Sequence, residues 1–474
     1  MAKLRPDICV IGAGSGGLTV AAAAAAFGVP VVLIERGKMG GDCLNYGCVP
    51  SKSMIAAAKH AHSLTHGATF GVADADPQVD FSKVMRHVHQ VIAAIAPNDS
   101  AERFTALGVT VIRGEARFFD GRTVTTGSYE IQARRFVIAT GSSPFIPPIP
   151  GLDSIPYFTN ETLFEQSERP AHLIVIGGGP VGLELAQAHR RLGSRVTVVE
   201  AAAALGKEDP ELAEFVLKHL RSEGIEIFEH ARLARVEKLG QEGVRIHFED
   251  AAGTHAIEGS HLLVAAGRRP NIAALMLDRA GIEHDTGGLK VTGNLRTTNR
   301  RVYAIGDVAG GPQFTHAANY HAALVIRALL FRLPARENRC LIPRVTFTDP
   351  ELAHIGLTED EAKRKRAGTK VLRWPFADND RAQTEHQTGG FIKLVTSRRG
   401  RILGVSVVGH GAGEMMNFWS LALSRKLTVR DIAGYIAPYP TLGEVGKRAA
   451  LTYFADAARS VPVRGLIRFL RLFG

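Results

Sequence analysis

Short apolar runs that end at glycine-rich turns recur along the chain, and the first begins near its start. Residues 8–11 are apolar, residues 12–17 are rich in glycine, and an alanine-rich stretch follows up to residue 26. An apolar run of this length predicts a buried strand of a parallel sheet, and the alanine-rich stretch predicts a helix. A second apolar run, 31–35, ends in an acidic residue. The segment therefore predicts a strand–helix–strand unit.

The same unit appears a second time, with apolar runs at 173–176 and 196–200. The key positions are Gly12, Gly14, Gly17 and Glu35 in the first copy, and Gly177, Gly179, Gly182 and Glu200 in the second. Such glycines let the backbone approach a pyrophosphate at a helix N-terminus, and the acid accepts hydrogen bonds from ribose hydroxyls. Two copies with the same spacing predict two dinucleotide-binding sites.

The boundaries between domains are marked by changes in composition. Residues 143–151 are rich in proline and cannot continue a helix or a central strand. Further boundaries are predicted near 266–271 and after 333–336. Beyond residue 342 the glycine motifs stop, and strand-like runs at 391–395 and 403–408 precede helical segments. This order predicts an α+β terminal domain.

Charge and hydropathy limit the class of protein. The formal net charge is +11, but the basic residues are scattered, which disfavours nucleic acid as a partner. A hydrophobic share of 45% disfavours wholesale disorder. No run of about 18 uncharged apolar residues is present, and no signal-peptide pattern precedes the first strand. We therefore expect a cytoplasmic protein.

The cysteines carry the most specific signal. There are four, Cys9, Cys43, Cys48 and Cys340, too few for the disulfide framework of a secreted protein. Cys9 lies in an apolar run and is interpreted as an inert core residue. Residues five apart on a regular helix are separated by about 7.5 Å along the axis, but Asn45 and Gly47 supply backbone freedom. Cys43 and Cys48 are therefore interpreted as a redox pair. No resident metal site is predicted, because further ligands are lacking nearby.

Several motifs together identify a family. The string Gly40–Lys52, the run Ala139–Ser142, the run Tyr303–Val308 and the two dinucleotide motifs resemble the pyridine nucleotide–disulfide oxidoreductases. That family includes dihydrolipoamide dehydrogenase, glutathione reductase and mercuric reductase. The resemblance implies an α/β fold with two Rossmann-like dinucleotide-binding domains, for FAD and NAD(P), and a C-terminal α+β dimerisation domain. It also implies a homodimer.

The resemblance assigns each segment of the chain to a domain. Residues 1–150 and 268–338 are expected to bind FAD, 151–267 to bind NAD(P)H and 339–455 to form the dimerisation domain. Residues 456–474 form a basic amphipathic tail.

The resemblance also implies the site residues. Cys48 is expected to lie against the flavin and Cys43 to meet the substrate, while Lys52 pairs with Glu184 near the flavin. The residues implied for FAD are Gly12, Gly14, Ser15, Gly17, Glu35, Lys52, Ala116, Thr140, Gly141, Asp307, Thr315 and His316. Those implied for the nicotinamide nucleotide are Gly177, Gly179, Gly182, Glu200 and Gly267.

A helix is expected to follow the Asp307 loop, with Thr315 as its N-cap and its N-terminus toward the negative end of the reduced flavin. His316 and His321 are interpreted as ordinary helix residues rather than as catalytic bases. Glu200, which four alanines follow, repels a 2′-phosphate and predicts NADH as the donor. NADPH stays open, because Lys207 is the nearest cation downstream.

One position departs from the pattern of the dithiol-using members. They carry a catalytic histidine in His-Pro-Thr-x-x-Glu, whereas this chain has Tyr439 before Pro440, Thr441 and Glu444. A phenol with a pKa near 10 is a poor general base at neutral pH. Mercuric reductases also resemble this chain in having tyrosine there, although their C-terminal cysteine pair has no counterpart after Cys340. Tyr439 and Glu444 are therefore included among the catalytic candidates.

The predicted function follows from these motifs. Electrons are expected to pass from NAD(P)H through FAD to the Cys43–Cys48 disulfide, and on to a disulfide or a soft metal ion, as in mercuric reductase. The alternatives are dihydrolipoamide dehydrogenase activity, and a flavin diaphorase or transhydrogenase that does not use the cysteines. A redox-sensing or membrane-tethered partner protein is a third, non-enzymatic alternative.

The tail has its own pattern. Arg464, Arg468 and Arg471 fall on one helical face, and leucines and phenylalanines fill the other. One interpretation is a terminal helix packed on its own protein. The other is contact of 462–473 with a membrane surface or a partner, which would place the protein at the cytoplasmic face of the membrane.

Overall fold

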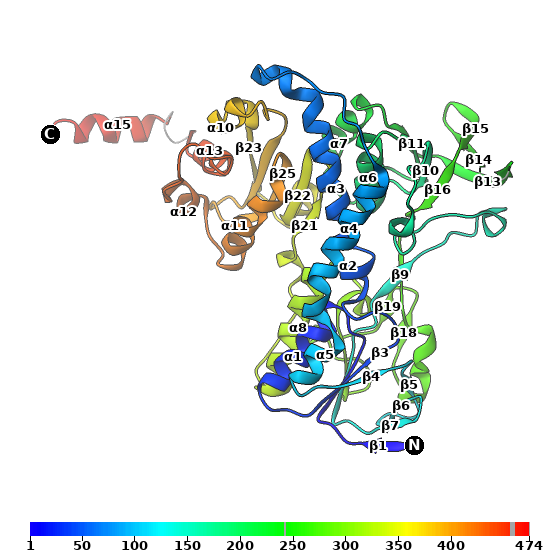
Figure 1. Cartoon of the computed structure of the whole chain (residues 1–474). Coiled ribbons are helices and arrows are strands. Elements are labelled where there is room, and N and C mark those ends of the chain that lie inside the picture. Colours follow the sequence, from blue (N-terminus) through cyan, green and yellow to red (C-terminus); the bar gives the residue numbers. More distant parts are fainter. Residues whose placement is uncertain (241–242, 456–459, 474) are drawn as a thin grey trace. The chain divides into compact units, whose positions relative to one another are not determined.

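The computed structural model describes residues 1–240, 243–455 and 460–473, and the chain divides into two compact units (Figure 1). The first unit consists of Met1–Ala203 and Ile225–Arg339, and the second of Ala204–Gly224 and Cys340–Gly474.

The first unit contains a five-stranded parallel sheet with the order β20-β8-β2-β3-β4. Its strands are Val302–Ala304 (β20), Arg135–Ile138 (β8), Ile8–Ile11 (β2), Val31–Glu35 (β3) and Thr110–Arg113 (β4). Ile8 is paired with Val31 on one side and with Arg135 on the other. β20 follows the second glycine motif in sequence but pairs with β8, so the chain returns to its first sheet after completing the second repeat.

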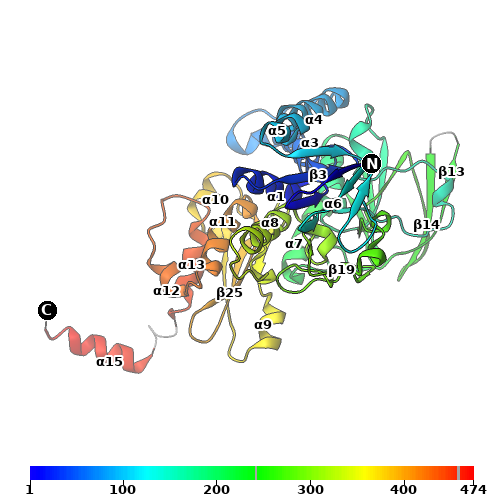
Figure 2. The same cartoon turned by 90° about the horizontal axis from the view of Figure 1, so that it is seen from below.

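Two helices with small side chains pack together on this sheet. They are α1 (Ser15–Ala26) and α8 (Thr315–Leu330), which lie side by side (Figures 1 and 2). Ala21 and Ala24 of α1 share a core with Ala322 and Val325 of α8. Alanine at these positions allows the close approach of the two helices, which brings the N-terminus of α8 toward the first glycine motif.

The second repeat builds a parallel sheet of the same kind, with the order β12-β11-β10-β16. Its strands are Glu226–Phe228 (β12), Arg195–Val199 (β11), His172–Ile176 (β10) and His261–Val264 (β16), and α6 (Pro180–Arg191) follows β10. An antiparallel sheet of β13 (Arg232–Leu239), β14 (Gly243–Asp250) and β15 (Gly253–Gly259) lies in the same part of the sequence.

Smaller elements complete the first unit. Short strands form a sheet of β1 (Ala2–Leu4), β7 (Tyr129–Ile131), β6 (Val124–Thr126) and β5 (Arg117–Phe118). Two further pairs join β9 (Ser142–Pro144) to β17 (Arg268–Pro270), and β18 (His284–Asp285) to β19 (Gly288–Leu289). The remaining helices are α2 (Gly41–Asn45), α3 (Cys48–Ser63), α4 (Phe81–Ile95) and α5 (Ala101–Ala106).

The second unit is built on an antiparallel sheet with the order β21-β22-β25-β24-β23. Its strands are Arg344–Thr346 (β21), Glu351–Gly356 (β22), Ile402–Gly409 (β25), Phe391–Thr396 (β24) and Lys370–Pro375 (β23). The helices are α7 (Pro210–Ser222), α9 (Glu359–Lys365), α10 (Asp380–Thr384), α11 (Ala412–Ser424), α12 (Val429–Gly434), α13 (Glu444–Thr452) and α15 (Val461–Leu470). Both strands expected from the apolar runs beyond residue 342 are present as β24 and β25.

A buried ion pair joins α7 to this sheet within the second unit. Lys393 of β24 is almost fully buried, and its Nζ lies 2.9 Å from both carboxylate oxygens of Asp209, the N-cap of α7. A buried ammonium group is stable only when it is paired in this way. The two parallel sheets and the separate antiparallel sheet confirm the predicted fold class, while the exact domain boundaries stay predictions.

Candidate active site

The cysteine pair lies where two helices meet. Cys43 is in α2, and Cys48 is the first residue of α3. Between them Gly47 has φ −116° and ψ −110°, and a Cβ added there would lie 2.8 Å from a carboxylate oxygen of Asp42. The glycine therefore permits the break between the helices, which brings the two thiols into hydrogen-bonding contact. The backbone freedom that the sequence predicted at Gly47 is therefore used in the structure.

The environment of Cys48 favours its thiolate. Its pKa is lowered to about 6, chiefly because the Cys43 thiol donates a hydrogen bond to it. The Thr315 hydroxyl and the charge of Lys52 lower this pKa further, whereas burial of the sulfur acts in the opposite direction. The Sγ of Cys48 lies 3.4 Å from Oγ1 of Thr315. The same hydrogen bond and burial raise the pKa of Cys43. The proton shared by the pair therefore rests on Cys43, and the negative charge rests on Cys48.

Lys52 and Glu184 form the ion pair that was expected of them. Lys52 lies one turn after Cys48 on α3, and its Nζ is 2.6 Å from Oε2 of Glu184 on α6. The Glu184 side chain is only 6% exposed. A buried carboxylate requires such a partner, so the pair fixes α3 against α6 and holds a positive charge near Cys48.

The N-terminus of α8 differs in one detail from the expectation. Thr315 is the first residue of the helix rather than its N-cap, so the N-cap prediction is wrong. Phe314 occupies the N-cap position with extended dihedral angles, and no side chain caps the helix. The chain thus enters the helix one residue earlier, which frees the Thr315 hydroxyl to contact Cys48. The first backbone N–H groups of α8 lack a side-chain acceptor at the N-cap, an arrangement that suits an anionic group.

The two histidines of α8 have structural surroundings. His316 stacks its ring on Phe314, with 5.1 Å between the ring centroids. His321 is fully buried, its Nδ1 accepts a hydrogen bond from the backbone N–H of Gly306 at 3.1 Å, and its Nε2 lies 2.9 Å from Oε1 of Glu337. His321 therefore holds the loop that carries Asp307, in agreement with its interpretation as an ordinary helix residue.

Asp307 belongs to a polar network that the sequence did not reveal. The Ser142 hydroxyl donates to Oδ2 of Asp307 at 2.5 Å, and Nε of Arg268 donates to that hydroxyl at 2.8 Å. Arg268 also pairs with Asp42, the residue before Cys43, at 3.0 Å. Burial raises the pKa of Asp307, and the bond from Ser142 partly offsets this effect. The network connects the Asp307 loop to the cysteine-bearing helix. Asp42, Ser142 and Asp307 each lie in a motif that the sequence showed, but nothing in the sequence indicated that Arg268 joins them.

The first glycine motif has the form of a dinucleotide cradle. Gly12 has φ +107°, and a Cβ there would lie 2.4 Å from the Ala139 carbonyl oxygen, while a Cβ on Gly17 would lie 1.9 Å from the Gly12 oxygen. A Cβ on Gly14 would meet no atom within 4 Å, so the backbone there faces open space. The Glu35 carboxylate accepts from the Ala13 N–H at 2.6 Å, which places the acid beside the cradle.

The second motif repeats this geometry. Gly177 has φ +115°, a Cβ on Gly182 would lie 2.0 Å from the Gly177 oxygen, and a Cβ on Gly179 would meet nothing within 4 Å. Glu200 accepts from the Gly178 N–H at 2.6 Å. The N-cap glycines of α1 and α6 have nearly identical dihedral angles and no side-chain cap. Both sites therefore fit a pyrophosphate at a helix N-terminus.

The other residues expected at the cofactors have varied surroundings. Ser15 is the first residue of α1, and Ala116 is buried in the core of the first sheet. Thr140 donates through Oγ1 to the Asn271 carbonyl at 2.7 Å. Gly141 and Gly267 both have positive φ and open space at the Cβ position.

Tyr439 and Glu444 belong to the second unit. The Tyr439 side chain is exposed, and its hydroxyl donates to Oδ2 of Asp380 at 2.9 Å. This hydrogen bond and the charge of Asp380 raise the pKa of the phenol above its usual value. Glu444 is the first residue of α13. The sequence indicated Tyr439 and Glu444 as catalytic candidates but gave no sign of Asp380, which lies in another segment of the chain.

The chain matches two family models. Residues 6–322 match "Pyridine nucleotide-disulphide oxidoreductase", and residues 342–450 match the dimerisation domain of the same family.

Named relatives extend the match over nearly the whole chain. A mercuric reductase of Lysinibacillus sphaericus is 36% identical over 95% of this chain and 83% of that protein. A dihydrolipoyl dehydrogenase of Geobacillus stearothermophilus is 33% identical over 94% of this chain and 96% of that protein. Among solved structures, the HOCl-induced flavoprotein disulfide reductase RclA from Escherichia coli has a TM-score of 0.83 at 28% identity, covering 94% of this chain and 99% of that one. A Cu(II) complex of RclA gives the same TM-score and covers 93% and 98%.

Proposed function

The chain belongs to the pyridine nucleotide-disulphide oxidoreductase family, and we propose that it passes electrons from NADH to a soft, thiol-binding metal ion. Family members are NAD(P)H-dependent flavoproteins, and this chain carries the redox cysteine pair of the family. The observation that carries the proposal is the contact between Cys43 and Cys48 at the break between α2 and α3, with Cys48 held as the thiolate.

FAD is assigned to the first repeat and the nicotinamide nucleotide to the second. Gly14, the N-terminus of α1 and Glu35 are proposed to hold the adenosine and pyrophosphate part of FAD, and Asp307 its ribitol. Bound there, FAD supplies the two-electron link between NADH and a disulfide. The corresponding groups of the second repeat are Gly179 and Glu200. Glu200, followed by alanines rather than arginines, supports NADH over NADPH.

The chain's own groups prepare the sulfur atoms for a metal ion. Two-electron reduction of the Cys43–Cys48 disulfide breaks the S–S bond and yields one thiol and one thiolate. Lys52 and the Thr315 hydroxyl stabilise the thiolate of Cys48, while Cys43 is proposed to meet the substrate. Thiolates are the preferred ligands of soft cations, and binding of the metal displaces the proton from Cys43. Re-formation of the Cys43–Cys48 disulfide then releases two electrons, which reduce one mercuric ion to the element or two cupric ions by one electron each.

Tyr439 favours a metal ion over a dithiol as substrate. A dithiol substrate must lose and gain protons during exchange, which requires a group that titrates near neutral pH. The pKa of Tyr439 is raised further by Asp380, so this phenol does not meet that requirement. Pro440, Thr441 and Glu444 nevertheless retain the surroundings of a dithiol enzyme, and lipoamide is the substrate of the second candidate function.

The reaction is tested by supplying NADH with mercuric or cupric ion to the FAD-loaded enzyme. Cuprous ion is trapped by a selective chelator and elemental mercury is collected as vapour. We expect metal-dependent NADH oxidation in the wild type and its loss in Cys43→Ser, while dye reduction directly from the flavin persists. Lipoamide turnover much faster than metal turnover would instead favour the dihydrolipoyl dehydrogenase activity. Equal metal reduction by Cys43→Ser would favour the diaphorase.

The second unit carries the segment that is expected to form a dimer. The matched dimerisation domain supports a homodimer. Among the residues that the structure describes, no helix combines the length and the apolarity needed to cross a bilayer. The cytoplasmic location stays a prediction.

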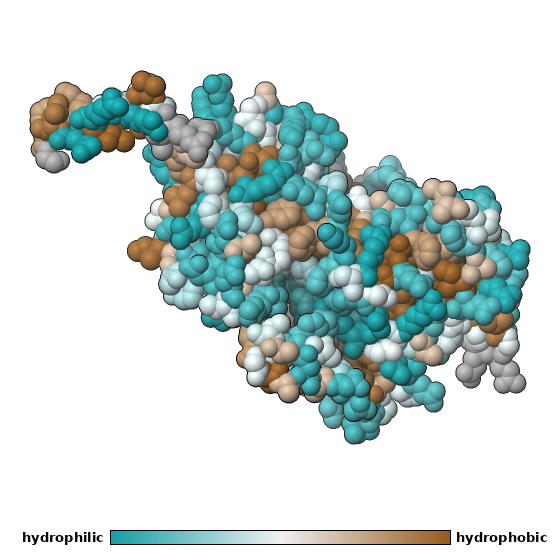
Figure 3. Space-filling model, turned by 90° about the horizontal axis from the view of Figure 1, so that it is seen from above, coloured by the Kyte–Doolittle hydropathy of each residue, from teal (hydrophilic) through white to brown (hydrophobic). Residues whose placement is uncertain are grey.

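We further propose that α15 binds the surface of an anionic membrane. Arg464, Arg468 and Arg471 follow helical spacing on one face, and residues 460–473 include no acidic residue. Leu466, Phe469, Leu470 and Phe473 fall on the opposite face, and each is more than half exposed. Figure 3 shows the hydrophobic and hydrophilic faces of this helix next to each other. A short helix of this composition lies in the lipid interface, with its arginines toward the phosphates.

A further inference from the structure

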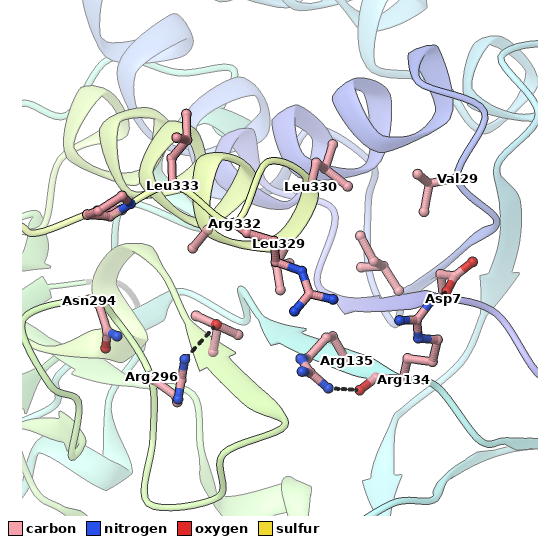
Figure 4. Close-up of a pocket in the computed structure, with 15 residues that line it drawn as sticks. Asp7, Val29, Arg134, Arg135, Asn294, Arg296, Leu329, Leu330, Arg332 and Leu333 are labelled. Carbon is pink, nitrogen blue, oxygen red and sulfur yellow. Dashed lines mark hydrogen bonds and ion pairs between the residues drawn. The ribbon is translucent and has the colours of Figure 1, made fainter.

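A cavity of about 750 Å³ lies in the first unit at the opposite edge of the sheet from the glycine motif. Ile8 and Arg135, the first residues of β2 and β8, line it, together with residues at the C-terminal end of α8 (Figure 4). The first glycine motif follows the carboxyl end of β2, where nucleotides bind in sheets of this type. The cavity is therefore separate from both the cofactor sites and the cysteine pair.

The lining is strongly cationic. Arg134, Arg135, Arg296 and Arg332 surround the space, whereas Asp7 is the single carboxylate among the residues that line it. Asp7 already accepts a hydrogen bond from Arg134 at 2.7 Å. Three of the four guanidinium groups therefore face the cavity with no carboxylate from its lining to balance them.

Two of these arginines lack full compensation of their charge or hydrogen-bonding groups. Burial lowers the pKa of Arg135, and the charges of Arg301, Arg332 and Arg134 lower it further. The Nε of Arg296 is buried and has no hydrogen-bond partner among the described residues, although its guanidinium lies over the Tyr303 ring. Buried donors and buried charges of one sign are costly unless an acceptor of opposite charge is present.

The side-chain hydrogen bonds of Arg135 and Arg296 are not made to the nearby end of α8. The N–H of Leu333 already bonds the Arg327 carbonyl at the end of α8. The hydrogen bonds of the Arg135 and Arg296 side chains go instead to the Arg134 carbonyl, at 2.8 Å, and to the Tyr303 hydroxyl, at 3.4 Å.

We propose that this cavity binds a small organic diphosphate. Arginine is the residue best suited to phosphate oxygens, because its planar fork donates two hydrogen bonds at once. Val29, Leu329, Leu330 and Pro334 form apolar walls that would hold the organic part. The volume lies within the range of about 300–1,000 Å³ that is typical of small-molecule sites.

Titration calorimetry on the FAD-loaded enzyme tests the proposal, with inorganic pyrophosphate as the first probe at constant ionic strength. A second arm uses ADP in the presence of saturating NAD⁺, so that the second repeat is occupied. We expect both probes to bind the wild type, and Arg135→Gln to weaken binding by about 10-fold or more, the loss of a charge-assisted hydrogen bond. Tighter binding of ADP than of pyrophosphate supports the role of the apolar walls, and equal binding contradicts that role.

Two further variants keep the test decisive. Arg332 is exposed, so Arg332→Gln is not expected to disturb folding, and it should weaken pyrophosphate binding even if Arg135→Gln fails to retain FAD. Arg279→Gln removes the same charge from an exposed position outside the cavity and should leave binding unchanged. The proposal is overturned if pyrophosphate does not bind the wild type, or if all three variants bind it equally, since the ions would then be attracted only by the overall positive charge.

Discussion

The sulfur of Cys48 lies 3.4 Å from the hydroxyl oxygen of Thr315, although the two residues are far apart in the sequence. Cys48 begins α3 and Thr315 begins α8, so the N-termini of two helices meet at one sulfur atom. Helix N-termini carry partial positive charge and stabilise anions. This arrangement, with the thiol of Cys43 and the charge of Lys52, explains why the negative charge of the pair resides on Cys48.

The acidity of Cys48 predicts a pH profile for the reduced enzyme. Its pKa is lowered to about 6, so the thiolate is present above that pH and is lost as the pH falls through it. Alkylation of Cys48 by iodoacetamide, followed by mass spectrometry, should rise near pH 6. Thr315→Ala should move the profile to higher pH, whereas Thr315→Ser retains the hydroxyl and should not. A profile that rises only near the ordinary thiol value of 9.0 would refute this assignment of the charge.

Nucleotide choice is predicted from Glu200. The carboxylate beside the second cradle should repel a 2′-phosphate, so NADH should show the higher kcat/KM in flavin reduction. Glu200→Gln should lower the ratio of kcat/KM for NADH to kcat/KM for NADPH by about 10-fold, because one close charge repulsion is lost. Glu35→Gln in the first repeat is the matched control and should leave the ratio unchanged. A wild-type preference for NADPH would show that Lys207 or another cation reaches the phosphate.

Tyr439→His should raise the oxidation of dihydrolipoamide. The imidazole would titrate near neutral pH, and Asp380, which now accepts from the phenol, is placed to accept from the ring as well. General acid–base catalysis contributes about 10²–10⁴-fold, and a ring that is not ideally placed would gain less. Lipoamide-dependent NADH turnover measures the effect, with Tyr439→Phe as the control that adds no base. Unchanged turnover with intact flavin reduction would show that another feature excludes dithiols.

The tail should bind anionic vesicles in the full-length holoenzyme. Flotation with phosphatidylglycerol vesicles should recover the wild type, and added salt should reduce the recovery. Replacing Arg464, Arg468 and Arg471 with glutamine should weaken partitioning by about 100-fold, at roughly 1 kcal/mol for each arginine. The control replaces three exposed arginines elsewhere, Arg122, Arg279 and Arg399, and should still float. Recovery that is equal in both triple variants would mean that the general positive charge, rather than α15, binds the lipid.

The sequence predicted those features that depend on local pattern. The repeated glycine motifs, their acids and the strands β24 and β25 could be recognised because their spacing or apolarity is written in consecutive residues. The ion pair of Lys52 with Glu184 was expected from family resemblance and is present. The network of Arg268, Ser142, Asp307 and Asp42 could not be predicted, because it forms between segments brought together only by folding.

Contacts between distant segments also explain why the N-cap of α8 and the partner of Tyr439 differ from the expectations. Thr315 has a side chain that is typical of an N-cap, but Phe314 has the extended dihedral angles of that position. Which of the two residues precedes the helix depends on how α8 approaches Cys48, and this contact forms only on folding. Asp380 could not be recognised as the partner of Tyr439, since the motif around Tyr439 pointed to Glu444. The cationic cavity likewise combines arginines from β8, the 292–296 loop and the end of α8.

The central claim is that electrons from NADH reach substrate through Cys43 and Cys48. Anaerobic titration of the oxidised enzyme with NADH, followed by absorbance, tests it most directly, with Cys48→Ser and Cys43→Ser measured in parallel. We expect uptake of about two equivalents by the wild type, one for the flavin and one for the disulfide, and a long-wavelength charge-transfer band from the Cys48 thiolate. The band should be absent from Cys48→Ser, which still binds FAD, and present in Cys43→Ser. Complete bleaching of the wild-type flavin by one equivalent, without that band, would contradict the account.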